Sequence, residues 1–185
     1  MNRRQLLKSM SGVASGALLV NATKGIALPF AGVSASLEQD STMVKFAKAL
    51  SKNSKLIGFA NVEHDFSYSQ LTIEGRLPKD LIGCFYRNGP AKHERNNVRY
   101  QHLFEGDGMI QQFRIGDGKI SHQGKFINSA KYQQEQQAQR FLYPGPDTQV
   151  AHALSVSSPD AINTANTSVI SVGNDLWALW EAGSA

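Results

Sequence analysis

The spacing of apolar residues changes once along the chain, from a helical pattern to a strand-like one. In residues 36–58, apolar side chains recur at intervals close to one helical turn, and lysines take the opposite face. The apolar positions of this segment are Leu37, Val44, Phe46, Ala47 and Leu50. We therefore predict a helix in residues 36–58 that closes near Asn53 and Gly58, followed by a linker up to residue 68.

From residue 69 onward, short apolar runs alternate with turn-forming residues. Leu71 and Ile73 alternate with polar neighbours, which predicts a half-buried strand. Asn88-Gly89-Pro90 is a strong strand breaker, and Gly116-Asp117-Gly118 is typical of a hairpin turn. Between such turns the pattern predicts strands at residues 82–87, 98–104, 109–115 and 119–128.

The last third of the chain contains one more predicted hairpin. Its strands are residues 167–172 and 176–181, joined by Gly173-Asn174-Asp175. Residues 131–140 are polar and rich in glutamine, which fits either a short helix or a surface excursion. Short strands with frequent turns indicate an all-β fold, either a sandwich, a barrel or propeller blades, and periodicity alone does not choose among them.

Charge is concentrated at the N-terminus. Four of the 19 Lys and Arg residues lie in residues 1–35, which contain no acidic residue, so the other 15 balance the 15 Asp and Glu. The basic character therefore belongs to this leader, and the rest of the chain lacks the positive surface that nucleic-acid binding requires.

The leader itself has the order of an export signal. Arg3 and Arg4 precede Gln5 and two leucines, which resembles the twin-arginine motif, and a mild apolar stretch follows from Met10 to Thr23. This stretch is too short to span a bilayer as a stable helix. Small residues before Ser36 form a cleavage site, so we expect residues 1–35 to be a signal peptide cut after Ala35. The protein is then expected in the bacterial periplasm, delivered by the twin-arginine export machinery.

Cys84 is the single cysteine, so it forms no internal disulfide. Because it lies in the apolar run of residues 81–86, we expect it to be a buried structural thiol.

Six segments, in order along residues 70–183, resemble the carotenoid cleavage oxygenase family. They carry the family phrases G-x-L-P-x-x-L-x-G, R-N-G-P, H-x-F-x-G-D-G-M, an Arg-Phe landmark, N-T-A-N and L-x-A-L-x-E-x-G. In this chain they are residues 75–83, 87–90, 102–109, 140–141, 163–166 and 176–183. Each alone is a weak signal, but six in sequence are specific.

The resemblance implies a seven-bladed β-propeller with a non-haem Fe(II) held by four histidines, and glutamates that orient those histidines. Residues 69–185 would then be an incomplete, N-terminal part of the propeller, preceded by the short helix and linker of residues 36–68. The implied reaction uses O₂ to cleave a double bond of a hydrophobic conjugated substrate, namely a carotenoid, an apocarotenoid or a stilbene. The resemblance leaves peripheral membrane contact open.

Glu181 is the one residue whose role the resemblance transfers. The glutamate of the L-x-A-L-x-E-x-G strand orients an iron-ligand histidine in the family, and a carboxylate behind apolar strand residues needs a partner. The alternative is a glutamate at a strand end without a special role.

No iron ligand is expected within the chain itself. None of the five histidines is followed by proline, and no two share a metal-ligand spacing. We interpret His102 as a structural hydrogen-bonding residue and expect the other four, His64, His93, His122 and His152, on the surface or in loops. Gly106-Asp107-Gly108 is expected to be a tight turn, since it lacks the lysine of a phosphate-binding loop.

The sequence thus favours part of an oxygenase that is inactive as 185 residues alone, and unstable or aggregation-prone because a partial propeller leaves strand edges exposed. The alternative function class is an exported, non-catalytic β-domain that binds a hydrophobic ligand or a partner chain.

Overall fold

The computed structural model describes residues 41–185, and all of them belong to one compact unit of the chain. The predicted leader lies outside the described residues. The first element is helix α2 (Thr42–Lys52), which begins where the Ser41 hydroxyl accepts a hydrogen bond from the Val44 amide and ends at Asn53. A 3₁₀ turn, η2 (Ser54–Phe59), follows directly. The predicted helix is therefore confirmed in its central part and is shorter than expected.

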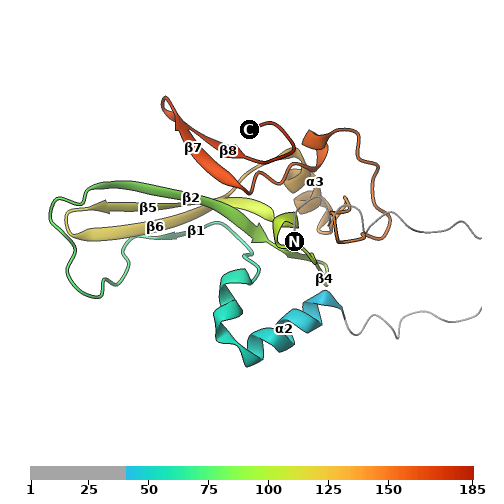
Figure 1. The fold of residues 1–185 in the computed structure, drawn as a ribbon, viewed down its shortest axis with the longest axis horizontal. Helices are drawn as coiled ribbons and strands as arrows, with labels where there is room; N and C mark the ends of the chain where they lie inside the picture. The colour runs from blue at the N-terminus through green and yellow to red at the C-terminus, as the bar shows by residue number, and fades with distance from the viewer. Residues whose placement is uncertain (1–40) are drawn as a thin grey trace, which may run out of the picture. The chain divides into compact units, whose positions relative to one another are not determined.

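A four-stranded antiparallel sheet occupies the middle of the chain, in the order β1-β6-β5-β2 (Figure 1). Its strands are β1 (Phe66–Tyr68), β2 (Gly83–Lys92), β5 (Asp107–Gly116) and β6 (Lys119–Phe126). The β5–β6 hairpin turns at Asp117 and Gly118, whose φ angles of 52° and 69° suit the turn predicted there. The all-β expectation is confirmed at this level.

Strand β2 runs through the predicted breaker instead of ending before it. Pro90 pairs with Gly108 of β5, and a bulge follows before Lys92. Proline is tolerated because β2 is an edge strand, where a missing backbone N–H breaks no ladder on the outer side.

Two other predicted strands are wrong. Leu71 and Ile73 are half-buried, but only the Leu71 amide bonds to the sheet, at 2.7 Å from the Ile120 carbonyl oxygen, so the edge strand is β1 instead. The predicted strand 98–104 is reduced to β4 (Val98–Arg99), which pairs with β3 (Glu94–Arg95). Its second half is the 3₁₀ turn η3 (Leu103–Glu105), because His102 and Glu105 form a reciprocal cap around it.

The C-terminal third contains helix α3 (Ala130–Ala138), the turn η4 (Pro159–Ile162) and the hairpin β7 (Ser168–Val172)–β8 (Asp175–Leu179). The helix decides between the two interpretations of residues 131–140, and the hairpin was predicted. Strand β7 lies beside β2 (Figure 1).

Three of the sequence motifs meet at one junction, which we call the motif junction and define as Asn88, Gly108 and residues 163–166. The Asn88 amide donates to the carbonyl oxygens of Ala165 and Ser168 at 2.7 and 2.9 Å. Gly108 packs so closely that a Cβ there would stand 2.2 Å from the Ala165 carbonyl oxygen. Motifs that are far apart in the sequence thus contact one another at this junction.

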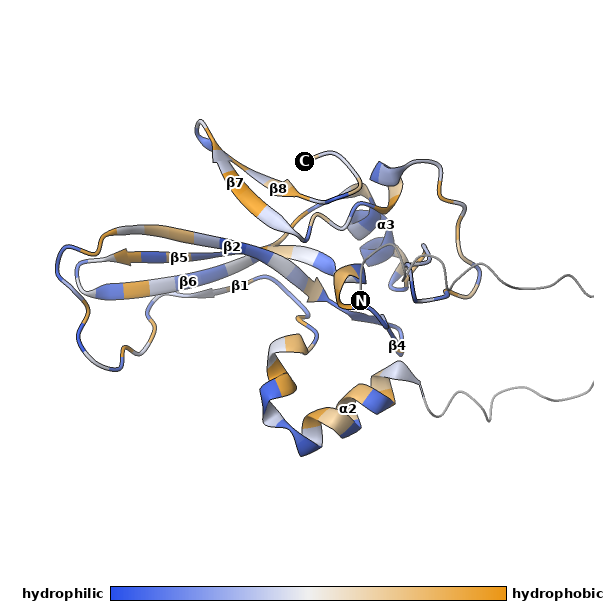
Figure 2. Cartoon of the chain, in the orientation of Figure 1, coloured by the Kyte–Doolittle hydropathy of each residue, from blue (hydrophilic) through white to orange (hydrophobic). Residues whose placement is uncertain are grey.

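The apolar core is small and lies at one end of the sheet. Ala91, Met109 and Phe126 are buried there, with Phe66 and Tyr132 packed against them. At the other end apolar side chains stand in solvent, and Phe85 is 58% exposed and Ile82 73% exposed. Cys84 is exposed in the same region, so its predicted burial is wrong: neither face of this part of β2 is covered. Figure 2 places orange, apolar positions along this uncovered half.

Candidate functional site

Glu181 follows strand β8 and is exposed within residues 41–185. Its carboxylate accepts a 2.7 Å hydrogen bond from the Thr167 hydroxyl, across the open end of the β7–β8 hairpin. The Thr167 amide in turn donates to the Leu179 carbonyl oxygen at 3.0 Å, which fixes the threonine. The bond from Thr167 lowers the pKa of Glu181, so the carboxylate is held ionised and oriented.

No histidine of residues 41–185 hydrogen-bonds to Glu181, whose side chain is held by the Thr167 hydroxyl in this part of the chain. The sequence argument placed the carboxylate among apolar residues at the inner end of a strand. Here it lies just beyond the strand, and the half-buried neighbour is Trp180. The role transferred to Glu181 stays a prediction.

His102 has the structural role that the sequence predicted. Its Nδ1 accepts a hydrogen bond from the Phe104 amide at 3.2 Å, and its own amide donates to the Glu105 carboxylate at 2.9 Å. The imidazole is therefore committed to capping η3.

Two of the other histidines are less exposed than predicted. His93 is 3% exposed, and its ring fills the space beside Gly106, where a Cβ would stand 2.7 Å from it. Burial, aided by the positive charge of Arg99, lowers the pKa of His93 to about 4, so this ring is neutral at pH 7. His122 lies in β6, half-buried, and stacks on Phe113 with ring centroids 4.0 Å apart. His64 and His152 are exposed in loops, as predicted.

Residues 41–185 contain no group of three or more His, Cys, Asp or Glu side chains that could hold a metal ion. The buried His93 already packs beside Gly106, and His102 already caps η3. The described residues therefore do not form an iron site by themselves.

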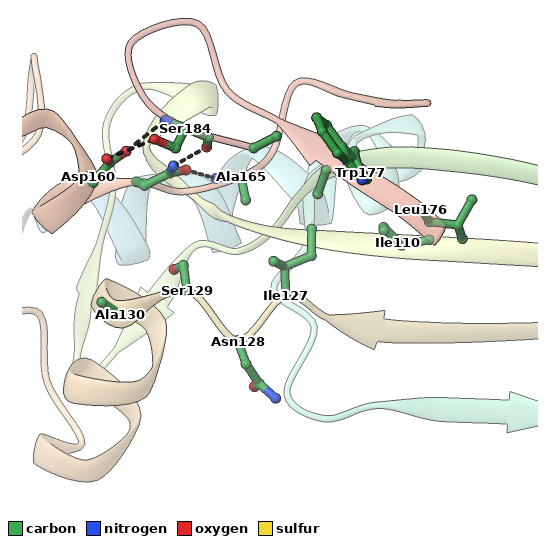
Figure 3. Close-up of a pocket in the computed structure, with 13 residues that line it drawn as sticks. Ile110, Ile127, Asn128, Ser129, Ala130, Asp160, Ala165, Leu176, Trp177 and Ser184 are labelled. Carbon is green, nitrogen blue, oxygen red and sulfur yellow. Dashed lines mark hydrogen bonds between the residues drawn. The ribbon is translucent and has the colours of Figure 1, made fainter. Parts of the chain in front are cut away.

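A cleft of 570 Å³ lies between the sheet and strand β8 (Figure 3). Ile110, Ile127, Leu176 and Trp177 give it apolar walls. Asp160 stands at one end, but both its oxygens accept hydrogen bonds from Ser184, at 2.7 and 2.9 Å, and these bonds lower its pKa. The cleft is thus an apolar surface without a free acid or base.

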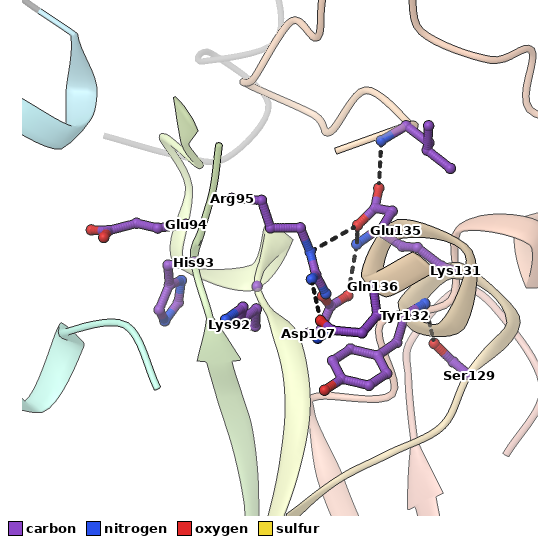
Figure 4. A network of polar contacts seen from close by, with 12 residues as sticks. Lys92, His93, Glu94, Arg95, Asp107, Ser129, Lys131, Tyr132, Glu135 and Gln136 are labelled. Carbon is purple, nitrogen blue, oxygen red and sulfur yellow. Dashed lines mark hydrogen bonds and ion pairs between the residues drawn. The ribbon is translucent and has the colours of Figure 1, made fainter. Parts of the chain in front are cut away.

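A buried ion-pair network joins α3 to the base of the sheet (Figure 4). Asp107 accepts from Lys131 at 2.7 Å and from Arg95 at 2.9 Å, and Lys131 also binds Glu135 at 2.9 Å. Burial alone would lower the pKa of Lys131, but the negative charges, Asp107 first, outweigh it and raise the pKa. Sequence reasoning missed this network, and the available signal was the Lys131–Glu135 spacing of one helical turn.

Glu135 and Glu105 hold the loop after α3. One oxygen of Glu135 accepts from the Leu142 and Tyr143 amides. Glu105 accepts from the amides of Asp147 and Thr148 and from the Thr148 hydroxyl, at 2.9, 2.8 and 2.5 Å. Two buried carboxylates therefore fix residues 141–148 against the base of the sheet.

The sequence profile of the family described as "Retinal pigment epithelial membrane protein" matches residues 59–185. The chain belongs to this family. The match covers the sheet, helix α3, the motif junction and Glu181, and the expectation of a carotenoid cleavage oxygenase relative is confirmed.

Relatives within the family are named as cleavage enzymes. The chain is 36% identical over 132 residues to the apocarotenoid-15,15′-oxygenase of Synechocystis sp., covering 69% of this chain and 27% of that protein. It is 33% identical to resveratrol cleavage oxygenase 1 of Aspergillus fumigatus, covering 65% and 23% of the two chains. It is 28% identical to the human β,β-carotene 15,15′-dioxygenase, covering 59% and 22%. The chain spans about a quarter of these relatives' length.

The fold agrees with solved structures of the Synechocystis enzyme. The cobalt-substituted form matches with a TM-score of 0.61 and 36% identity, over 69% of this chain and 28% of that one. A form with its glutamate changed to glutamine matches at 0.60, with 34% identity over 68% and 27%.

The solved variants of that enzyme mark three positions at a recognisable spacing. One replaces a glutamate, another the tryptophan directly before it, and a third a threonine fourteen residues before it. The same spacing separates Thr167, Trp180 and Glu181 here, and Thr167 and Glu181 are hydrogen-bonded.

Proposed function

We propose that this chain is the N-terminal part of an oxygenase that uses Fe(II) and O₂ to cleave a conjugated double bond of a carotenoid, an apocarotenoid or a stilbene. The observation that carries the proposal is the Thr167–Glu181 bond, at the spacing of the substituted positions in the Synechocystis enzyme. The named activities of three relatives, on an apocarotenoid, on resveratrol and on β,β-carotene, support the substrate range.

Within this function Glu181 is a positioning residue. Its ionised carboxylate, held by Thr167, would accept a hydrogen bond from the second ring nitrogen of an iron-ligand histidine and so fix that ring's tautomer and direction. As the family resemblance predicts, the iron ligands would lie in the three quarters of the relatives' length that this chain does not span.

The four-stranded sheet and the β7–β8 hairpin would be the first blade of a seven-bladed propeller and the start of the next. The antiparallel order β1-β6-β5-β2 and the position of β7 beside β2 support this arrangement. Because β1 (Phe66–Tyr68) belongs to that sheet, the propeller segment would begin at residue 66, three residues before the predicted boundary at 69, and residues 36–65 would be its N-terminal extension.

The place of action would be the periplasm, reached through the twin-arginine route after cleavage at Ala35. Arg3, Arg4 and the small residues before Ser36 support it. Within residues 41–185 no helix is long and apolar enough to cross a membrane.

The test starts from the genomic reading frame that contains codon 185. Its product is purified from the periplasm, its mass and iron content are measured, and it is incubated with an apocarotenal, β-carotene and resveratrol. We expect bound iron and two carbonyl products from at least one substrate. Glu181→Gln should lower kcat about 10- to 100-fold. The matched control is Glu74→Gln, since Glu74 is an exposed glutamate outside the β7–β8 hairpin.

An iron-free product that cleaves none of the three compounds contradicts the proposal. If such a product binds them without cleavage, the second candidate, a β-domain that binds a hydrophobic ligand, takes its place. The exposed apolar positions of the sheet and the cleft beside Trp177 favour that candidate.

A further inference from the structure

A second cavity, of 320 Å³, lies between the loop after α3 and the end of β8. It shares no lining residue with the cleft of Figure 3. Its apolar wall consists of Phe104, Pro144, Pro146, Ile162 and Trp180. A volume of this size suits a small ring compound.

Two buried hydroxyls belong to the same cavity wall. Tyr100 is 3% exposed and Thr164 is 5% exposed, and neither hydroxyl oxygen has a hydrogen-bond partner among residues 41–185. The Lys131 ammonium lies 5.2 Å from the centre of the Tyr100 ring and interacts with the Tyr100 hydroxyl, although its hydrogen bonds go to Asp107 and Glu135. Thr164 is therefore the hydroxyl with the stronger need of a partner. A buried hydroxyl without a partner is destabilising, and an oxygen supplied by a ligand would relieve that.

The charges around the cavity are already paired. Lys131 is neutralised by Asp107 and Glu135, and the Glu105 carboxylate on the wall accepts three bonds from residues 147 and 148. An anionic ligand would meet the Glu105 carboxylate at close range, with the nearest ammonium already bound to two acids. The apolar wall and the already paired charges together favour a neutral ligand.

We propose that this cavity binds a small neutral ring compound that carries a carbonyl or hydroxyl oxygen. The ring lies between the two prolines and Trp180, and the oxygen is directed to the hydroxyls of Tyr100 and Thr164. The site needs no iron, and it stands whether or not the proposed oxygenase function holds.

The test uses the 185-residue chain and three probes of similar size: acetophenone, which has a carbonyl, ethylbenzene, which has no oxygen, and benzoate, which is an anion. Binding is followed by tryptophan fluorescence, since Trp180 lines the cavity, and by thermal unfolding. We expect saturable binding of acetophenone, and binding about tenfold weaker for each of the other two.

Two variants separate a ligand contact from a structural role. Thr164→Val keeps the side-chain shape and removes the hydroxyl, and it should weaken acetophenone binding about tenfold without lowering the unfolding temperature. Tyr100→Phe should act in the same direction, and Thr72→Val, an exposed position, should change nothing. The proposal is overturned if acetophenone does not saturate, if it binds no better than ethylbenzene, or if both hydroxyl variants bind it as the parent does.

Discussion

At the scale of single residues, burial sets the chemistry of the histidines more than sequence position does. His93 and His64 lie in stretches of similar polarity, yet one ring is enclosed and the other is in solvent. An enclosed imidazole resists protonation because its charged form loses hydration. His93 thereby links the folded state to pH.

The unfolding free energy should fall as pH falls through the window set by His93. Its pKa is about 4 when folded and 6.5 ordinarily, so between these values the unfolded chain binds more protons and the folded state loses stability. The full loss, reached below pH 4, is about 3 kcal/mol. Denaturant unfolding at pH 7, 5.5 and 4 measures it. His93→Gln should remove this part of the slope and His64→Gln should not, and equal slopes in the parent and His93→Gln would refute the assignment.

Thr167 controls the ionisation of Glu181, again at the scale of one side chain. Removing its hydroxyl in Thr167→Val should raise the pKa of Glu181, because the hydrogen bond that favours the carboxylate is lost. Thr167→Ser keeps a hydroxyl and should leave that pKa low. A carboxyl-carbon NMR titration reads both variants, and an unchanged Glu181 pKa in Thr167→Val would show that the bond does not form in solution.

At the scale of elements, the buried side chains of helix α3 are charged, while its Tyr132 packs against the apolar core. Lys131 and Glu135 are its buried residues, and Glu135 is 0% exposed. Glu135 also receives the amides of Leu142 and Tyr143, so one carboxylate fixes both the helix and the loop that follows.

Glu135→Gln should be strongly destabilising, by about 3 to 5 kcal/mol, because it leaves Lys131 and Arg95 with fewer buried partners. Glu74→Gln, at an exposed position, should cost about 0.5 kcal/mol or less. Urea unfolding of both variants makes the comparison. Similar losses for the two would mean that the buried network is not specially stabilising.

The elements that sequence predicted well are those with local signals. The β5–β6 and β7–β8 hairpins were found because glycine and aspartate mark their turns, and α2 because its apolar spacing is regular. The predictions that failed concern features set by contacts between residues distant in the sequence. Pro90 was taken as a breaker because its edge position is not visible in the sequence, and α3 was ambiguous because its stabilising partners, Arg95 and Asp107, are distant in the chain.

The same division holds for the candidate site. Glu181 and His102 were identified through motifs, and His102 has the structural hydrogen-bonding role that was expected, here as the cap of η3. The Thr167 partner was not foreseen, because cross-strand pairing at a hairpin end depends on the register of β7 and β8. The cavity at Trp180 was missed because loop residues 144–146 and β8 are brought together only by the fold.

At the scale of the whole molecule, the described residues carry too little core for their sheet. Buried apolar residues lie at one end of the sheet. At the other end, Leu81, Ile82 and Phe85 are exposed around the start of the edge strand β2. Such an edge, long and apolar, is a template for pairing with another chain.

The isolated 185-residue chain should therefore self-associate as its concentration rises. Ile82→Lys with Phe85→Lys places charges on this region and should shift the chain toward monomer without changing the motif junction. Light scattering across a concentration series measures the change. The matched control, Val44→Lys with Ile57→Lys, alters exposed apolar residues near α2 and should have less effect. A parent chain that stays monomeric throughout would contradict the expectation.

The hydrogen bonds of Asn88 also affect the order in which the sheet is completed. Its amide joins residues 77 and 80 positions further along the chain, so the edge of the sheet is completed only after a long stretch of polypeptide has been made. Closing so large a loop is slow, because its entropy is lost before the contacts that repay it are formed. During synthesis, β2 and β5 would already be paired before residues 165–168 were available to contact the β2 edge. The ribosome thus sets a delay in which this sheet is most vulnerable, and a chaperone that shields it would act then.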